Sequence, residues 1–124
     1  MTNRYKTYYP LSKTVGPLRL TYDDGELRID GLDRDRAQVV EIRFRDVLLT
    51  RILDEGIRLR LLQELGTERA LILVDEQSEL LPWLIEESLR TRDVGKAKHF
   101  LVFAGEEIVD VVSLSEPELL NSQR

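Results

Sequence analysis

The segment at residues 99–112 restricts the fold more than any other part of the sequence, because apolar side chains occupy both of its faces. A two-residue turn at Gly105-Glu106 folds this segment into a hairpin. Phe103 then pairs with Ile108. A strand pair that is apolar on both faces has to lie in the middle of a sheet and be covered on each side. The rest of the chain must therefore supply neighbouring strands and covering layers.

A second hairpin is predicted at residues 18–30, where apolar and polar side chains alternate. With Asp24-Gly25 as a type I′ turn, Tyr22 pairs with Leu27. The large apolar side chains then fall on one face, so this hairpin should have one buried and one solvent-facing side.

A strand is predicted from Gln38 to about Arg45, and its alternation breaks at Asp46-Val47. Residues 47–49 are apolar without alternation, which a β-bulge or a change of sheet face would produce. Beyond that point the strand can continue to Leu53.

Two helices are predicted, and the first has a competing interpretation. Asp54 is a good N-cap, apolar residues recur at helical spacing up to Leu65, and Gly66 suits the C-terminal cap. Residues 57–61 also alternate like a strand, but residues 62–64 break the alternation, which favours the helix. A buried strand at residues 70–74 comes next, and the second helix runs from Ser78 to about residue 90. Its expected buried stripe consists of Leu81, Leu84, Ile85 and Leu89.

These elements predict an α+β domain with an antiparallel or mixed sheet of five to six strands and two helices. A chain of 124 residues, 42% of them hydrophobic, can bury one core. We place the single α+β domain at residues 18–114, after an N-terminal arm at 1–17 and before a polar C-terminal tail at 115–124. Apolar runs such as 100–104 are far shorter than the roughly 20 residues of a membrane span. We expect a cytoplasmic protein without membrane contact, because the N-terminus also lacks the apolar segment of a secretion signal.

Missing residue types exclude several kinds of chemistry. The chain has no Cys, which excludes disulfides, thiolate catalysis and Cys-bound metal centres, and His99 is its single histidine. Glycine-rich phosphate motifs and the G-x-S-x-G motif are absent, and the carboxylates lack the spacing of a calcium-binding loop. The sequence therefore predicts no catalytic centre, no metal site and no cofactor.

One polar pair remains as a candidate for chemistry. In the last hairpin, His99 and Asp110 are diagonal neighbours on one face. A carboxylate orients an imidazole and raises its pKa, as general acid–base sites require. The alternatives are a structural polar pair, or a histidine at the sheet rim and an aspartate bonded to nearby backbone.

Acidic residues gather in the second half of the chain. Residues 1–62 carry 12 Lys and Arg against 10 Asp and Glu, whereas residues 63–124 carry 6 against 13. An acidic surface attracts a basic partner and speeds association, although acids also keep a small domain soluble. The candidate partner-binding residues lie around the last hairpin's turn and in the tail: Glu106, Glu107, Glu116 and Glu118.

Basic residues on the other strands permit a second kind of partner. Arginines near the tyrosines of the arm could contact nucleic acid, with cations on phosphates and aromatic rings on bases. Acids share the same strand faces, so cross-strand ion pairs explain the pattern without a ligand, and we do not expect nucleic-acid binding. The residues concerned are Arg19, Arg28, Arg43 and Arg45, with Glu26, Asp30 and Glu41 beside them.

Three segments resemble a family of small uncharacterised bacterial domains, and through them the immunity proteins of polymorphic toxin systems. The segments are VVEIRFRDVLLTRILDEG (39–56), SELLPWLIEES (78–88) and HFLVFAGEEIVDVVSLSEP (99–117). The resemblance covers about residues 18–118 and rests on core-forming residues, so it implies a shared fold and carries over no functional residue. The N-terminal arm has no counterpart.

We therefore predict a non-enzymatic domain that binds a protein, in its most concrete form an immunity-type inhibitor that occludes a basic toxin. One alternative is a small-ligand-binding domain or weak enzyme that uses His99 with Asp110. Another is a self-associating scaffold, including a homodimer, formed through apolar surface around Trp83, which lies off the centre of its helix stripe.

Overall fold

The computed structural model describes residues 4–10, 16–33, 35–66 and 70–121. Within these residues the chain forms nine strands, two α-helices and one 3-10 turn. In chain order they are β1 (Tyr5–Pro10), β2 (Leu18–Asp23), β3 (Glu26–Leu32), β4 (Gln38–Phe44), β5 (Val47–Asp54), η1 (Glu55–Ile57), α1 (Leu59–Leu65), β6 (Ala70–Asp75), α2 (Leu80–Glu87), β7 (Lys98–Ala104), β8 (Glu107–Ser113) and β9 (Glu118–Asn121).

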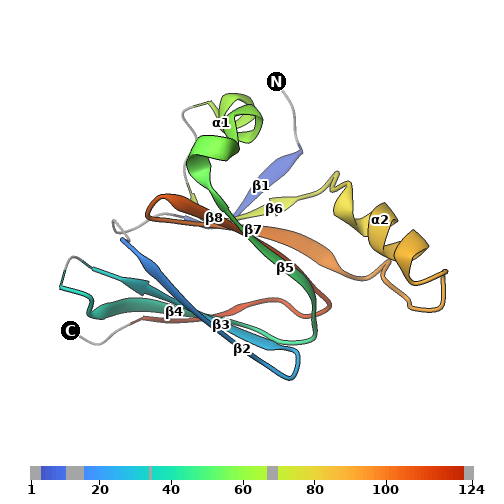
Figure 1. The fold of residues 1–124 in the computed structure, drawn as a ribbon, viewed down its shortest axis with the longest axis horizontal. Helices are drawn as coiled ribbons and strands as arrows, with labels where there is room; N and C mark the ends of the chain where they lie inside the picture. Colours follow the sequence, from blue (N-terminus) through green and yellow to red (C-terminus); the bar gives the residue numbers. More distant parts are fainter. Residues whose placement is uncertain (1–3, 11–15, 34, 67–69, 122–124) are drawn as a thin grey trace.

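The strands form two antiparallel sheets that pack face to face, with both helices beyond the larger sheet (Figure 1). The five-stranded sheet has the order β1-β6-β7-β8-β5, and the four-stranded sheet has the order β2-β3-β4-β9. The α+β class and the two helices are confirmed, and one sheet has the predicted number of strands. We did not predict the second sheet. No described helix has the length and apolar character needed to cross a membrane.

The main core lies between the two sheets, and smaller apolar clusters lie under the helices. The inter-sheet core includes Ile29, Ile42, Phe44, Phe100 and Val109. On the opposite face of the five-stranded sheet, one cluster packs under α1 and another under α2. The last hairpin is therefore covered on both sides, as its two apolar faces predicted.

Both predicted hairpins are confirmed residue by residue. Tyr22 pairs with Leu27 across a turn whose two central residues, Asp24 and Gly25, have positive φ angles of 48° and 82°. Phe103 pairs with Ile108, and the two strands of this hairpin are interior strands of the five-stranded sheet.

The break in alternation at residue 46 is the point where the chain changes sheets. β4 belongs to the four-stranded sheet and β5 to the five-stranded sheet, and Asp46 between them has a positive φ of 54°. The register of β5 against β8 then shifts between Val47 and Leu49. A turn and an irregular register together explain why residues 47–49 do not alternate.

The helix interpretation of residues 54–65 is confirmed. The Asp54 side chain accepts a hydrogen bond of 2.7 Å from the Gly56 amide and starts η1, and Gly66 ends α1 with a positive φ of 63°. The predicted extent of the second helix is wrong at its end. α2 stops at Glu87, and Leu89 has left-handed backbone and is exposed, so it is not part of the buried stripe.

The predicted boundaries at residues 17 and 114 do not separate the sheets from the flanks. β1 lies within the predicted arm and pairs with β6, while β9 lies within the predicted tail and pairs with β4. Each strand completes one edge of a sheet, and Tyr8 of β1 packs edge-on against Phe100 with ring centroids 5.4 Å apart. The remainder of the arm and tail at 1–3, 11–15 and 122–124 falls outside the described residues.

Candidate functional site

His99 and Asp110, the predicted polar pair, are in direct contact. Nε2 of the imidazole lies 2.7 Å from Oδ1 of the carboxylate, and both side chains are buried. They lie on the face of the five-stranded sheet that the helices cover, between the clusters under α1 and α2. The interpretation that placed the histidine at an exposed sheet rim is wrong, because this face is closed by the helices.

The second ring nitrogen of His99 is also engaged inside the protein. Nδ1 lies 2.6 Å from the Ser78 hydroxyl and 3.6 Å from a carboxylate oxygen of Asp75. A neutral ring with its proton on Nε2 satisfies both close contacts, because it donates to Asp110 and accepts from Ser78. Ser78 in turn accepts a 3.1 Å hydrogen bond from the Leu80 amide at the start of α2.

Asp110 is fully buried and is held by two arginines. Its second oxygen accepts hydrogen bonds of 2.7 Å from Arg51 of β5 and 2.7 Å from Arg58 at the start of α1. Burial by itself would raise the pKa of this carboxyl group. The hydrogen bonds from His99 and Arg51 and the charge of Arg58 outweigh it and hold the pKa below its ordinary value.

A third ion pair extends the same group of residues to the N-terminal strand. Arg4 contacts both carboxylate oxygens of Asp75, at 2.8 Å and 2.9 Å, and this pairing raises the pKa of the Arg4 guanidinium. Burial, together with the charge of Asp75, raises the pKa of the adjacent Tyr5 to about 12. We call the connected set the His99 network; its members are Arg4, Arg51, Arg58, Asp75, Ser78, His99 and Asp110.

The His99 network contains the residue types of a hydrolase triad, with the imidazole of His99 in contact with both Ser78 and Asp110. All three side chains are buried, and the Ser78 hydroxyl also accepts a hydrogen bond from the Leu80 amide at the start of α2. A cavity of about 360 Å³ beside β1 and β6 reaches Asp75, yet neither His99 nor Ser78 lines it. A molecule in that cavity would therefore not touch the imidazole. The network instead joins α1, α2 and the N-terminal strand to one sheet face.

A second polar group lies on the uncovered face of the four-stranded sheet. Arg28 contacts Asp30 at 3.0 Å and Glu41 at 3.5 Å, and Arg43 also pairs with Glu41. Gln38 donates to both carboxylates, at 2.5 Å and 3.3 Å. The predicted cross-strand pairing is confirmed for Arg28 and Glu41, whereas Arg28–Asp30 lies within β3 and Arg43–Glu41 lies within β4. We call this set the Asp30 ladder, and Gln38 is the member we did not predict.

The four predicted partner-binding acids lie at two separate places. Glu106 and Glu107 are exposed at the β7–β8 turn, whereas Glu116 and Glu118 follow the opposite end of β8. The seven residues of β8 separate the two pairs by roughly 20 Å. Glu116 contacts Tyr8 and Lys98, and Glu118 contacts Arg45, so the charges of the second pair are balanced within the chain.

The structure brings Glu106 and Glu107 together with residues that we did not predict as part of a surface. Glu107 is the register partner of Asp54, and the Glu55 amide donates a 2.9 Å hydrogen bond to the Glu106 carbonyl. The η1–α1 segment at this corner exposes Ile57 (71%) and Leu59 (66%). We call this surface the acidic corner; its residues are Asp54, Glu55, Ile57, Leu59, Glu106 and Glu107.

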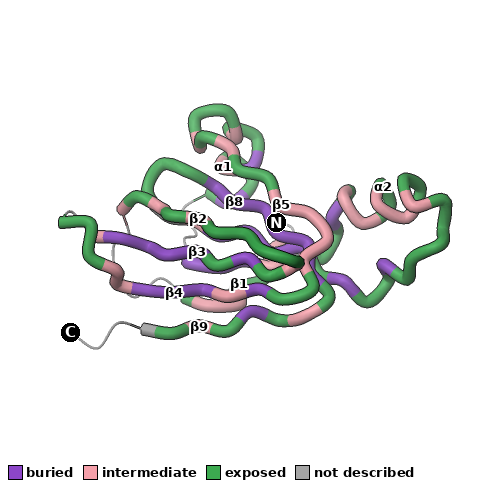
Figure 2. Tube along the Cα trace, turned by 60° about the horizontal axis from the view of Figure 1, so that its bottom comes forward, coloured by how far each residue is buried: buried purple, intermediate pink, exposed green. Residues whose placement is uncertain are grey.

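The sequence contained a signal for this corner, which we interpreted differently. Ile57 fits the spacing of a buried helix stripe, but the helix begins only at Leu59 and η1 holds Ile57 outside the core. Figure 2 shows the exposed turn that carries η1 and α1 above β5 and β8. On α2, Trp83 is half exposed, so the surface predicted for self-association is accessible to solvent. Self-association itself stays a prediction.

Comparisons with other proteins add no relatives. The chain matches no protein-family model, no curated protein and no solved structure. The resemblance to immunity proteins therefore stays a prediction. Among the described residues, no group of three or more His, Asp or Glu side chains has an arrangement that could hold a metal ion.

Proposed function

We propose that this chain is a non-enzymatic domain that binds a basic protein through its acidic corner. The observation that carries the proposal is the exposure of Ile57 and Leu59 beside four carboxylates. Apolar anchors surrounded by charge are typical of protein interfaces, where a few buried side chains supply most of the affinity.

The charge at the corner supports a basic partner. Glu106 and Glu107 are exposed, and neither forms an ion pair with a cationic side chain among the described residues. Arg58, the nearest cation along the chain from η1, contacts Asp110 inside the protein and is only 14% exposed. Glu106 and Glu107 therefore face solvent without a counter-ion in the part of the chain that the structure describes, and would raise the association rate of a positively charged protein.

The contacts of the His99 network support binding rather than catalysis. A general acid or base has to reach a substrate, whereas Ser78, His99 and Asp110 are all buried and neither Ser78 nor His99 lines the cavity that reaches Asp75. In the finer form of the proposal, the partner is a toxin whose active-site rim is basic, and the acidic corner blocks that rim as an immunity protein would.

The proposal is tested by affinity capture from a lysate of the source organism at low salt with three forms of the protein. The corner variant is Glu106→Lys/Glu107→Lys with Leu59→Ser. The matched control is Glu116→Lys/Glu118→Lys, which makes the same charge change at the other end of β8. We expect the wild type and the control to retain a basic protein, and the corner variant to recover at least tenfold less of it. The captured protein should dissociate as the salt concentration is raised.

Equal recovery of the same proteins by the corner variant and the wild type would show that the corner is not the binding surface. For the finer form, the captured protein is expressed with and without this chain. Neutralisation of its toxicity by the wild type, and not by the corner variant, supports immunity, whereas equal toxicity with both contradicts it.

A further inference from the structure

The η1–α1 segment contributes Ile57 and Leu59 to the acidic corner, and the residue between them points the other way. Ile57 is 71% exposed and Leu59 is 66% exposed, whereas the side chain of Arg58 is only 14% exposed. Nη1 of Arg58 donates a 2.7 Å hydrogen bond to Oδ2 of Asp110, which is fully buried in β8. The segment therefore presents two apolar side chains to solvent and is anchored by the arginine between them.

The Arg58–Asp110 ion pair is the contact that fixes the corner end of α1 to the interior. No residue from 55 to 60 is fully buried, and the first buried residue of α1 is Leu61, which packs in the cluster under the helix. A helix of seven residues has little stability of its own, so its position depends on tertiary contacts. Before Leu61, Arg58 supplies the side-chain contact that reaches a buried group.

Arg58 is also the junction between η1 and α1 in the backbone. Its amide donates a 3.0 Å hydrogen bond to the Glu55 carbonyl, and its carbonyl accepts a 3.0 Å hydrogen bond from the Leu62 amide. No side chain caps α1 at this residue. Because the same residue joins the two helical turns and contacts Asp110, its ion pair decides the direction in which Ile57 and Leu59 project.

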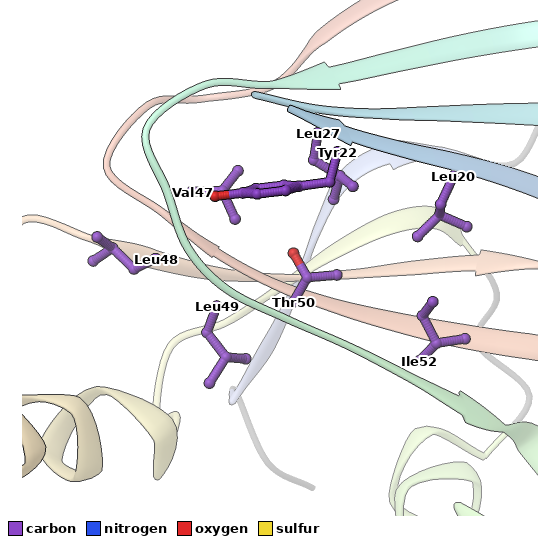
Figure 3. Close-up of a pocket in the computed structure, with 8 residues that line it drawn as sticks. All are labelled: Leu20, Tyr22, Leu27, Val47, Leu48, Leu49, Thr50 and Ile52. Carbon is purple, nitrogen blue, oxygen red and sulfur yellow. The ribbon is translucent and has the colours of Figure 1, made fainter. Parts of the chain in front are cut away.

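A second arginine makes the same contact from outside the corner. Arg51 of β5 donates from Nε to the same Oδ2 of Asp110, also at 2.7 Å. Its neighbours Thr50 and Ile52 line the groove between β2 and β5, and Figure 3 shows them on that strand. Because Arg51 lies in neither η1 nor α1, its loss removes a hydrogen bond from Asp110 without releasing the corner.

We propose that Arg58 is the positioning residue of the acidic corner: its ion pair with Asp110 holds η1 and the start of α1 so that Ile57 and Leu59 face a basic partner. The proposal rests on the function proposed for the corner and separates two properties of that interface. The glutamates of the β7–β8 turn attract the partner and set the association rate. The apolar side chains that Arg58 positions hold the partner and set the dissociation rate.

The first test needs no partner. Amide hydrogen exchange, followed by NMR, compares the wild type with Arg58→Met and Arg51→Met, each of which removes one positive charge and one hydrogen bond to Asp110. The amides of Glu55 and Leu62 should exchange about tenfold faster in Arg58→Met, because the corner opens locally, and at the wild-type rate in Arg51→Met. The amide of Val109 in β8 serves as the reference for a change in global stability.

The second test uses the purified basic protein that the wild type retains and the corner variant does not. Surface plasmon resonance measures its association and dissociation rates with each form. In Arg58→Met the association rate should stay within about twofold of wild type, and the dissociation rate should rise about tenfold. Arg51→Met should change neither rate. A loss of global stability alone would lower the amount of active protein and leave the dissociation rate unchanged.

Arg58→Lys tests the role by partial rescue, and it replaces Arg58→Met if that variant does not fold. Arg58 makes one hydrogen bond to Asp110, which an ammonium group can also make, although without the geometry of the guanidinium. We expect the exchange rates at the corner and the dissociation rate of Arg58→Lys to lie above those of the wild type and below those of Arg58→Met.

Unchanged exchange at Glu55 and Leu62 in Arg58→Met, or the same increase in Arg51→Met, would overturn the positioning role whether or not a partner is found. Faster exchange with an unchanged dissociation rate would overturn the link between the position of the corner and binding. If no basic protein is retained by the wild type, the function proposed for the corner fails, and the exchange rates decide the positioning role by themselves.

Discussion

The outward faces of the two sheets both carry ion pairs between aspartate and arginine, but the two sets of ion pairs differ in how far they are shielded from water. On the five-stranded sheet, Asp110 is covered by α1 and α2, and its two arginine partners, Arg58 and Arg51, are 14% and 43% exposed. On the four-stranded sheet, Asp30 is also buried, but its partner Arg28 is 44% exposed. Helices exclude water from the first ion pair, whereas the second is shielded mainly by the long side chains of the ladder itself.

The two faces also differ in how far along the chain the partners lie. Asp110 contacts Arg51 and Arg58, which are 59 and 52 residues away, whereas Asp30 contacts Arg28 and Gln38 at separations of 2 and 8 residues. The His99 network therefore forms only when the tertiary structure is complete. The Asp30 ladder needs only neighbouring strands. We infer that stability depends more on the first than on the second.

Removal of Asp110 is expected to have the largest effect on stability. Asp110→Ala leaves Arg51, Arg58 and His99 without their shared carboxylate, and both His99 and most of Arg58 are shielded from water. Breaking a buried ion pair in this way costs about 3–5 kcal/mol of the free energy of unfolding. Urea denaturation followed by circular dichroism measures it. A cost below about 1 kcal/mol would contradict the view that this carboxylate is enclosed.

His99→Gln is expected to have the next largest effect and also decides between a structural and a catalytic role. The shorter amide cannot reach both Ser78 and Asp110, so a buried polar group loses its partner at a cost of about 1–3 kcal/mol. Thermal and urea unfolding measure this change. A catalytic histidine would instead be replaced with little change in stability and with loss of ligand binding or turnover.

Asp30→Ala is expected to cost less, about 1 kcal/mol, because Arg28 can turn to solvent and still pair with Glu41. The same urea titration measures it beside Asp110→Ala. If the two variants lose equal stability, the covering helices do not decide the strength of these ion pairs, and the comparison between the two faces fails.

Local patterns in the sequence predicted much of the fold. The turn residues Asp24-Gly25 and Gly105-Glu106 determine the register of the two hairpins. Once the two turn residues are fixed, each residue of the second strand has one defined partner on the first. That register placed His99 beside Asp110. The partition into two sheets was not predicted, because it depends on the turn at Asp46 and on which strands pair at long range.

The rest of the polar site depends on contacts between distant segments. Ser78 was predicted as a helix cap, but its contact with His99 requires β6 to pair with β7. Arg4, Arg51 and Arg58 resemble other surface arginines in sequence, and only the folded chain directs them at buried carboxylates. One part of the acidic corner was predicted, because Glu106 and Glu107 lie at the predicted turn. The exposure of Ile57 was not predicted, because it depends on α1 beginning only at Leu59.

Acidification is expected to produce the smallest effect, because protonation of Asp110 removes its charge and keeps its shape. The pKa of Asp110 in the folded protein is lowered below its ordinary value of 3.8. A lowered pKa means that the charged form stabilises the fold above the unfolded-state pKa and that this stabilisation is lost as the pH falls through the folded-state pKa. The difference in unfolding free energy between wild type and Asp110→Asn should therefore be constant from pH 7 to about 5 and shrink below pH 3.8.

Urea titrations at each pH measure this difference. Thr50→Val, which changes no titratable group, should give a difference from wild type that does not depend on pH. A difference that stays constant into strong acid would mean that the pKa of Asp110 is the same in the folded and unfolded states and that the arginines do no more than offset the effect of its burial.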